Sequence, residues 1–400
     1  MPEAVIVSTA RTPIGRANKG SLVECRPDDL AAMIVQAAMA KVPALDGTMI
    51  DDLILGCAQP SGESGYNIAR VTAILAGMPT VPGVTVNRYC SSSLQGIRMA
   101  AHAVRAGEGD AFVCAGVETV SHFSSGMSDT GPHNTKFAEA EARSAERTNG
   151  ADAWEPMKGM PDIYLSMGQT AENVRLAENV TRQEMDEFAA LSQQRAVQSQ
   201  QNGFFEREIS PVTLSDGTVV SKDDGPRDGT TAEKLSQLKP VFRPDGEVTA
   251  GNACPLNDGA AAVIVMSDTK ARELGLTPLA RIVASGVTAV DPEIMGMGPV
   301  EACRQAMKRA GMTIDDIDLV EINEAFAAQV IPSARHLGIP WDKLNIHGGG
   351  IALGHPFGMT GSRIMTTLLN GLEDGSKTIG MESMCVGGGQ GMAMIVERLS

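Results

Sequence analysis

Short runs of β-branched and apolar residues alternate with helix-periodic segments along most of this 400-residue chain. In the first third, the strand-like runs lie at 4–8, 53–56, 83–86 and 111–116, and the helical segments lie at 28–45, 67–76 and 94–107. This rhythm predicts an α/β fold with a mostly parallel sheet, helices on both faces and functional groups at the carboxyl ends of the strands. Aromatic residues make up only 4% of the chain, which suits helices packed closely on sheets.

The same rhythm returns near the C-terminal end, so the two ends of the chain look like a duplication. Predicted strands at 280–287, 319–322, 378–384 and 391–396 enclose predicted helices at 299–310, 325–336 and 361–372. A buried strand at 259–266 closes the first half, before a proline-containing linker at 276–278. We therefore expect a first half made of residues 1–117 and 252–275 and a second half made of residues 276–400.

The intervening residues 118–251 break the rhythm. Residues 121–158 are rich in small polar and charged residues, which predicts exposed loops, and helices are predicted at 167–178 and 181–202. A mixed-charge stretch at 221–243 holds basic residues that are more often a solvated face than a ligand site: Lys222, Arg227, Lys234, Lys239 and Arg243. We interpret 118–251 as a subdomain inserted into the first half.

Charge and cysteine content exclude several classes of function. The chain has 33 basic and 48 acidic residues, and its net charge of −15 disfavours nucleic acid or an anionic membrane surface as a partner. The seven cysteines are scattered and lack CxxC spacing, so neither a disulfide framework nor a zinc site is indicated. We see no signal peptide and no apolar run of the roughly 18 residues that span a bilayer. We expect a cytoplasmic protein without membrane insertion.

A cysteine stands where the strand-like run at 83–86 gives way to the helix at 94–107. The junction reads Asn87-Arg88-Tyr89-Cys90-Ser91-Ser92-Ser93, and its small residues leave room for a substrate. Free N–H groups and the positive end of the helix dipole favour a thiolate at such a junction. We therefore expect a lowered pKa for Cys90 and a nucleophilic sulfur near neutral pH. The alternative is a buried cysteine that packs as a small apolar residue.

Later stretches of the sequence favour the interpretation of Cys90 as a nucleophile. His355 lies between Gly354 and Pro356, and the proline restricts the histidine that precedes it. Its imidazole can take the proton of Cys90 or donate to an oxyanion. The glycines at 348–350 would let the backbone approach a ligand closely.

Asn323 and Cys385 are two further candidate catalytic residues. Asn323 closes a predicted strand and opens a helix, where it can hold a water or donate to an oxyanion, and Glu324 beside it can orient a histidine. Taken alone, this asparagine could equally be a helix cap. Cys385 is a second thiol, and the glycines that follow it, including Gly387, leave space for a substrate α-carbon.

Together these stretches resemble the motifs of the thiolase family. Four motifs occur in the family's order: Asn87-Arg88-Tyr89-Cys90-Ser91-Ser92-Ser93, Asn323-Glu324-Ala325-Phe326-Ala327, Gly354-His355-Pro356 and Cys385-Val386-Gly387-Gly388-Gly389. The similarity continues at 6–15, 167–173 and 257–261, so it covers essentially the whole chain. It implies a duplicated thiolase fold, which is a five-layer α-β-α-β-α sandwich whose inserted loop domain, here 118–251, covers coenzyme A. Such proteins are usually dimers or tetramers.

The resemblance also implies a role for each motif. Cys90 would accept the acyl group and His355 would activate it. His355 and a water held by Asn323 would form one oxyanion hole, and the backbone N–H groups of Cys90 and Gly387 would form the other. Cys385 would deprotonate acetyl-CoA in condensation or protonate its enolate in thiolysis. These roles agree with the residue chemistry, since a thioester intermediate needs a soft nucleophile and an enolate needs preorganised donors.

By the same resemblance, further residues would contact CoA or the acyl substrate. They are Met167, Arg227, Thr230, Leu235, Ala250, Gly251, Cys254, Phe326 and His347. This makes part of the basic stretch at 221–243 a candidate ligand site. Two departures from the family pattern bear on the choice of acyl chain: His347 before the glycines, and Cys254-Pro255 after Asn252-Ala253.

The expected function is that of a thiolase in fatty acid metabolism, such as β-oxidation. CoA would cleave a 3-oxoacyl-CoA to acetyl-CoA and a shortened acyl-CoA, or two acetyl-CoA would condense to acetoacetyl-CoA. Ketosynthases share the fold, but the Asn323 and Cys385 motifs argue against that class. The remaining alternative is a non-catalytic thiolase-like protein that binds acyl-CoA or lipid. Metal and nicotinamide motifs are not found, so acyl-CoA and CoA are the expected partners, without a separate cofactor.

Overall fold

The computed structural model describes residues 2–148, 154–156 and 159–400. A ten-stranded sheet runs through these residues in the order β10-β11-β12-β9-β1-β8-β5-β3-β4, with β2 beside β8. The strands of its N-terminal half are β1 (Ala4–Arg11), β2 (Gly15–Arg16), β3 (Asp52–Gly56), β4 (Gly83–Val86), β5 (Ala111–Thr119) and β8 (Asn257–Ser267). Those of its C-terminal half are β9 (Ala280–Ala289), β10 (Leu319–Ile322), β11 (Ile379–Val386) and β12 (Gln390–Arg398).

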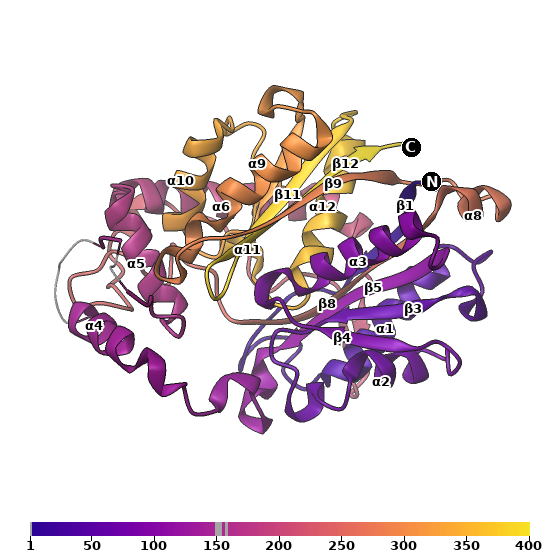
Figure 1. Cartoon of the computed structure of the whole chain (residues 1–400), viewed down its shortest axis with the longest axis horizontal. Coiled ribbons are helices and arrows are strands. Elements are labelled where there is room, and N and C mark those ends of the chain that lie inside the picture. Colours follow the sequence, from indigo (N-terminus) through magenta and orange to yellow (C-terminus); the bar gives the residue numbers. More distant parts are fainter. Residues whose placement is uncertain (1, 149–153, 157–158) are drawn as a thin grey trace.

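Helices form three layers around the two halves of the sheet (Figure 1). On the outer face of the N-terminal half, α1 (Pro27–Ala40) and α2 (Ile68–Leu75) share one apolar core with its strands. Between the halves, α3 (Ser92–Ala106) and α12 (Thr360–Asp374) share a core with strands of both. On the other outer face, α9 (Gly298–Ala310) and α10 (Ala327–Leu337) cover the C-terminal half. The expected α-β-α-β-α layering is confirmed.

The expectation of a mostly parallel sheet is wrong. Within the described residues, the parallel ladders are β3 with β4, β3 with β5 and β10 with β11, and the other ladders are antiparallel. A parallel pair needs a crossover connection, whereas β11 and β12 are joined directly by a glycine loop at 387–389. The halves meet where β1 pairs antiparallel with β9, at Val5 with Arg281 and at Ile6 with Ala280.

Helix ends follow local chemistry. α1 begins with Pro27 and has Asp28 and Asp29 in its first turn, as the sequence predicts. It ends at Ala40 and not near residue 45, because Pro43 disfavours helical backbone in the residue before it. The helix α6 (Arg182–Gln201) begins at a capping box in which Thr181 and Glu184 bond each other's backbone N–H groups.

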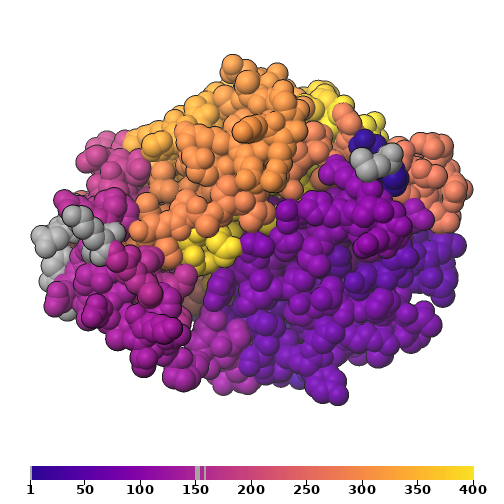
Figure 2. Space-filling view, viewed as in Figure 1, coloured from indigo at the N-terminus to yellow at the C-terminus, as the bar shows by residue number. Residues whose placement is uncertain are grey.

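The inserted segment leaves the sheet after β5 and returns at β8, and its helices α4 and α5 lie at the left of the molecule (Figures 1 and 2). Its helices and strands are α4 (Ala138–Thr148), α5 (Met167–Ala177), α6, α7 (Ala232–Leu235), β6 (Val212–Thr213) and β7 (Val219–Val220). The helix α4 corrects the prediction of loops throughout 121–158, since its alanines, glutamates and arginines are strong helix formers. Residues 149–153 and 157–158 of that prediction lie outside the described residues.

The remaining elements are short. Two further helices are α8 (Asp268–Glu273) and α11 (Gly350–Leu353). Single 3₁₀ turns occur at η1 (Gly47–Met49), η2 (Gly62–Ser64), η3 (Tyr89–Ser91), η4 (Val120–Ser125), η5 (Ser128–Thr130), η6 (Thr135–Phe137), η7 (Phe204–Arg207), η8 (Pro292–Met297) and η9 (Ile314–Asp316). Across the described parts of the chain, no helix combines the length and apolarity that crossing a bilayer requires.

Candidate active site

The predicted reacting residues come from strand ends in both halves of the sheet. Cys90 lies in η3, between β4 and α3, and Cys385 lies near the end of β11. Asn323 directly follows β10, the parallel neighbour of β11. His355 lies in the loop before α12, whose first turn is bonded to the start of α3. Functional groups at the carboxyl ends of strands are what the sequence predicts.

The sulfur of Cys90 is buried, and only 8% of the residue is exposed. Burial raises the pKa of the thiol to about 12, although the backbone N–H groups of Gly387 and of Cys90 itself act to lower it; the Glu118 carboxylate raises it further. The expected lowering by the helix dipole is therefore wrong for the free protein, because desolvation outweighs those donors. A thiolate at Cys90 needs a proton acceptor within the site.

The buried imidazole of His355 is held in a defined tautomer by its neighbours. Its Nδ1–H donates to Thr360 Oγ1 at 2.6 Å, and the Thr360 hydroxyl donates in turn to the carbonyl of Pro356 at 2.8 Å. Asn323 Nδ2–H donates to Nε2 of the imidazole at 3.2 Å. These bonds hold the tautomer that carries its proton on Nδ1 and leaves a lone pair on Nε2. Burial, with the charge of Arg363 as a second cause, lowers the pKa of His355 to about 3, so the ring is neutral near pH 7.

Two further thiols interact electrostatically with Cys90. Burial raises the pKa of Cys385 well above its ordinary value, and the charges of Cys90 and Cys254 raise it further. Burial raises the pKa of Cys254 to about 12, with Cys90 as the next cause. Each thiol therefore opposes ionisation of the others, and the site favours a single thiolate at a time.

A cavity of about 470 Å³ opens beside Cys90. Its lining includes Cys90, Gly387 and Met167, three of the residues predicted from the sequence. Much of the rest comes from the inserted segment, in which the His133 ring stacks on Tyr164 with their centroids 3.8 Å apart. The cavity therefore connects the buried sulfur with the loops that were expected to cover the substrate.

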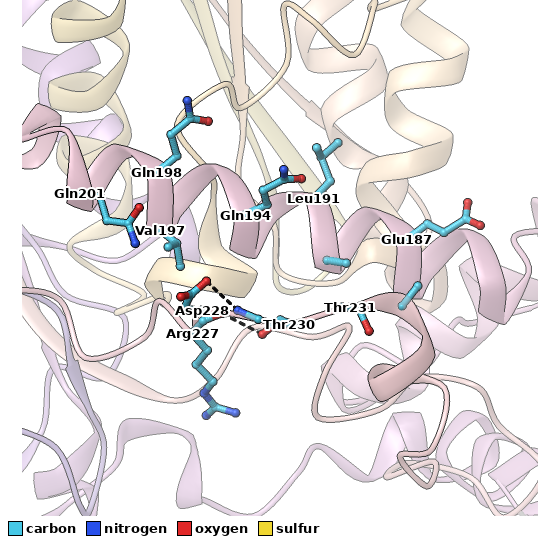
Figure 3. A pocket seen from close by; sticks show the side chains of 13 residues that line it. Glu187, Leu191, Gln194, Val197, Gln198, Gln201, Arg227, Asp228, Thr230 and Thr231 are labelled. Carbon is cyan, nitrogen blue, oxygen red and sulfur yellow. Dashed lines mark hydrogen bonds between the residues drawn. The ribbon is translucent and has the colours of Figure 1, made fainter.

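A second cavity of about 810 Å³ lies between α6 and the segment 227–232 (Figure 3). Arg227 and Thr230, both predicted from the sequence, line it together with glutamines of α6. The Thr230 hydroxyl donates to the Arg227 carbonyl at 2.9 Å, while the Arg227 side chain extends away from α6 (Figure 3). Among the described residues, Cys90 and His355 do not line this cavity.

The other predicted contact residues lie close to these elements. A Cβ at Gly251 would lie 2.7 Å from Leu235 and 2.6 Å from Leu238, so two leucine side chains cover this glycine. Ala250 beside it is exposed. The ring of Phe326 packs edge-on against Phe242, with centroids 6.0 Å apart.

The structure places His347 away from both cavities. Its ring stacks on Phe204 with centroids 3.5 Å apart, and its Nδ1 bonds the Ser199 hydroxyl at 3.0 Å. Burial lowers the pKa of His347 to about 4. These contacts are those of a core histidine, which corrects the expectation of a substrate contact.

Two neighbouring expectations are also corrected. Glu324 accepts hydrogen bonds from the Ser192 hydroxyl at 2.6 Å and from Asn345 Nδ2 at 2.8 Å, and it does not orient a histidine. A Cβ at Gly348 would lie 2.7 Å from α6, and one at Gly349 would lie 2.3 Å from Glu324. These glycines therefore admit close internal packing rather than a ligand.

Known proteins match this chain over its whole length. The thiolase N-terminal domain matches residues 4–269, and the thiolase C-terminal domain matches residues 276–398. The chain belongs to the thiolase family. The 3-ketoacyl-CoA thiolase of Bacillus subtilis (strain 168) is 44% identical over 410 residues, which cover 99% of this chain and 100% of that protein. The 3-oxoadipyl-CoA/3-oxo-5,6-dehydrosuberyl-CoA thiolase of Escherichia coli (strain K12) is 43% identical over 409 residues, with 100% of both chains covered.

A solved thiolase-type structure has the same fold. The crystal structure of the Bacillus anthracis acetyl-CoA acetyltransferase superposes with a TM-score of 0.88 at 38% identity, covering 100% of this chain and 99% of that chain. This thiolase is accordingly an acyltransferase with CoA thioesters as its substrate class. The non-catalytic alternative receives no support, since all three of these relatives carry the name of an enzyme.

Sequence reasoning missed residues that support this thiolase site. Thr360 bonds His355, Gln59 lines the cavity next to Cys90, and Glu118 accepts a hydrogen bond from the backbone N–H of Gln59. An acidic residue at the end of the apolar run 111–116 was the available signal for Glu118. In the described ranges, no group of three or more histidine, cysteine or acidic residues is placed to hold a metal ion.

Proposed function

We propose that Cys90 is the acyl-accepting nucleophile of this thiolase and that His355 is its base. The observation that carries the proposal is the tautomer of His355, whose Nδ1–H donates to Thr360 and whose Nε2, which accepts from Asn323, is the ring nitrogen that can take up a proton. Transfer of the thiol proton to Nε2 gives a thiolate and an imidazolium, and their attraction offsets part of the cost of burying two charges.

In the cleavage direction, the thiolate attacks the 3-oxo carbonyl carbon of a 3-oxoacyl-CoA. The bond between C2 and C3 breaks, the acyl group remains on Cys90 as a thioester, and acetyl-CoA leaves as its enolate. Cys385 gives its proton to C2 of the enolate, and the proton held by His355 replaces it. The thiol of a second CoA then attacks the thioester and returns its own proton to Cys90, so the shortened acyl-CoA leaves and the cycle closes. Condensation of two acetyl-CoA is the reverse path.

Two sets of donors support the charges that develop. The N–H groups of Cys90 and Gly387 face the sulfur, within reach of the carbonyl oxygen of an acyl group carried there. The second set is His355 with a water on Asn323. The Oδ1 atom of Asn323 is buried and has no hydrogen-bond partner among the residues that the structure describes, which supports a bound water at this point.

We propose that the nucleotide end of CoA occupies the 810 Å³ cavity between α6 and 227–232. Among the described residues, Arg227 is the one cation of its lining, and Glu187 and Asp228 in the same lining are carboxylates, so binding of a phosphate there would depend on the arginine. From this end of CoA inward, the ligand would then contact Thr230, Leu235, Ala250 and Gly251. Phe326, Cys254 and Met167 would then bring the pantetheine to Cys90.

The acyl chain of the substrate would occupy the 470 Å³ cavity beside Cys90. Relatives named for 3-ketoacyl-CoA and for 3-oxoadipyl-CoA are 44% and 43% identical, so overall identity does not select the acyl chain. Thiolysis rates measured on a panel of 3-oxoacyl-CoA substrates of increasing chain length would identify the preferred acyl chain. Activity confined to acetoacetyl-CoA would indicate that the enzyme functions as an acetyl-CoA C-acetyltransferase. Activity that rises with chain length would indicate a role in β-oxidation.

We also propose that this thiolase forms a homo-oligomer, a dimer or tetramer, through the face around β4 and α2. β4 is an edge strand of the sheet. Nearby, Tyr66 is 97% exposed, and Ile74 and Leu75 are 53% and 45% exposed. An unpaired edge beside exposed apolar side chains fits a second copy of the chain. Light scattering tests this, and a monomeric Tyr66→Asp, Leu75→Asp variant would locate the contact.

The cytoplasm remains the proposed location. All seven cysteines of the chain are free, and free thiols persist in reducing compartments.

The deciding experiment compares Cys90→Ala and Cys385→Ala. The first should abolish both turnover and the acyl adduct detected by intact mass, whereas the second should block the carbon–carbon step and still allow acylation of Cys90 by acetyl-CoA. Cys303→Ala is the matched control, since Cys303 is a buried free cysteine of α9. Wild-type thiolysis by Cys385→Ala would overturn the assignment of the proton donor.

A further inference from the structure

A single buried carboxylate joins the loops that frame the active site. Glu118, near the end of β5, is 1% exposed. Its Oε2 accepts hydrogen bonds from the backbone N–H groups of Ala58 and Gly358, both at 2.9 Å, and its Oε1 accepts one from the N–H of Gln59 at 3.1 Å. Ala58 and Gln59 follow β3 in the N-terminal half, whereas Gly358 lies three residues after His355 in the C-terminal half.

The backbone of the His355 loop rests directly on the ends of β3 and β5. A Cβ at Gly358 would lie 2.4 Å from the carbonyl oxygen of Val117 and 2.7 Å from that of Gly56. A Cβ at Gly116 would lie 2.1 Å from the Gly358 carbonyl oxygen. With no side chain able to fit between them, the position of this loop depends on polar contacts such as those of Glu118.

Gln59 extends the connection to the substrate cavity. Its Oε1 accepts hydrogen bonds from the N–H groups of Ser128 and Asp129, and its Nε2–H donates to the Asp129 carboxylate at 2.6 Å. Gln59, Ser128, Asp129 and Phe357 all line the cavity beside Cys90. The hydrogen-bonded path therefore runs from the His355 loop, through one carboxylate, to the inserted segment.

We propose that Glu118 is a positioning residue of this thiolase, whose carboxylate holds the His355 loop and the Gln59 loop in register around Cys90. This inference rests on the proposed roles of Cys90 and His355. The charge also acts at a distance, since it raises the pKa of Cys90. Burial raises the pKa of Glu118 itself to about 7; the titratable group that touches it is the Cys57 thiol, 3.8 Å from Oε1, and its other partners are backbone N–H groups.

Two variants of Glu118 separate the effect of side-chain length from the effect of side-chain charge. Glu118→Asp keeps the charge but is one methylene too short to bond both loops. Glu118→Gln keeps the side-chain length but loses the charge. If its amide oxygen accepts from Ala58 and Gly358, its NH2 group faces the backbone N–H of Gln59, and this N–H loses its acceptor. Glu382→Gln is the matched control, because Glu382 is a buried carboxylate of β11 that has no hydrogen-bond partner among the described residues. We expect kcat/KM for thiolysis to fall roughly 10- to 100-fold in both Glu118 variants and to stay unchanged in the control.

Two readouts distinguish positioning from a purely structural role. Amide hydrogen exchange at Gly358 and Gln59 should accelerate at least tenfold in Glu118→Asp. The pH profile of Cys90 alkylation by iodoacetamide should shift to lower pH in Glu118→Gln, because the opposing charge is gone, and should not shift that way in Glu118→Asp.

Wild-type kcat/KM together with unchanged exchange at Gly358 in Glu118→Asp would overturn the proposal, as would an alkylation profile unmoved in Glu118→Gln. Absence of thiolysis by the wild-type protein on every 3-oxoacyl-CoA would instead count against the proposed function. The exchange and alkylation measurements need no turnover, so they decide the role of Glu118 in that case too.

Discussion

At the residue scale, the proposed reactivity of Cys90 depends on which ring nitrogen of His355 carries the proton. The pKa of the thiol is raised to about 12 by burial and that of the imidazole is lowered to about 3, so both groups are neutral in the free protein. Only a histidine that presents Nε2 as an acceptor can take the thiol proton. Thr360 is what holds the other proton on Nδ1.

Thr360→Val should therefore lower kcat/KM for thiolysis about 10- to 100-fold, because valine keeps the shape but removes the acceptor of Nδ1–H. Steady-state rates and the rate of acyl-adduct formation on Cys90 measure the effect. Thr366→Val on the same helix is the control, since in the described part of the chain its hydroxyl donates to the carbonyl of Ser362 at 2.8 Å and to no other group. Equal activities of the two variants would show that Thr360 does not set the tautomer.

Substitution of His347 should change stability but not CoA binding, whereas substitution of Arg227 should change CoA binding but not stability. His347→Ala removes a buried ring stacked on Phe204, so the free energy of unfolding should fall by about 2–4 kcal/mol while KM for CoA stays the same. Arg227→Ala should raise KM for CoA at nearly constant stability. Urea unfolding and steady-state kinetics of both variants decide this. A raised KM in His347→Ala without loss of stability would return His347 to the substrate site.

The sequence motifs lead to four candidate reacting residues, but not to the electrostatics around them. Cys90, His355, Asn323 and Cys385 stand in short motifs whose residue types already indicate the chemistry. The raised pKa of Cys90 comes from burial by segments distant in sequence, and Glu118 gains its role only when Gly358 is brought onto β5. Burial by distant segments leaves no signal in the residues next to Cys90, so the effect of the helix dipole was overestimated.

At the element scale, periodicity located most strands and helices but not the strand directions. The rhythm holds where helices connect parallel neighbours, such as β3 with β4 and β10 with β11. It says nothing about β1, β8, β9 and β12, whose antiparallel pairings come from direct or long connections. The helix α4 escaped prediction because polarity was weighed above the helix propensity of its residues.

The packing of α9 on β12 gives a test at this scale. A Cβ at Gly391 would lie 1.9 Å from the carbonyl oxygen of Gly298, so helix and strand touch backbone to backbone. Gly391→Ala should lower the free energy of unfolding by about 1–3 kcal/mol through overpacking. Gly131→Ala is the control, since nothing lies within 4 Å of a Cβ there and its φ is −72°. Equal stabilities by urea unfolding would contradict the close approach.

At the scale of the whole molecule, buried charges make stability depend on pH. Arg11 is fully buried with Glu208 at 2.6 Å and Asp223 at 2.8 Å. Arg363 is also buried, and its charge acts on Glu321 and Glu382. Burial raises the pKa of Glu382 well above its ordinary value and that of Glu321 to about 8. The folded protein therefore holds protons that the unfolded chain releases.

Glu321 gives the direction of this dependence. Between about pH 4.5 and about pH 8 the folded state keeps the proton of Glu321 and the unfolded state has lost it, so this residue makes stability fall as pH rises, by at most about 1.4 kcal/mol per pH unit. The lowered pKa values of His355 and His347 act oppositely, since stability then falls as pH drops below about 6.5. Glu321→Gln removes only the first effect. The unfolding free energy of the wild type minus that of the variant should therefore decrease steadily from about pH 5 to about pH 8, when both are measured in urea at one protein concentration. A difference that does not change with pH would mean that Glu321 is ionised in the folded protein, paired with Arg363 rather than neutral beside it.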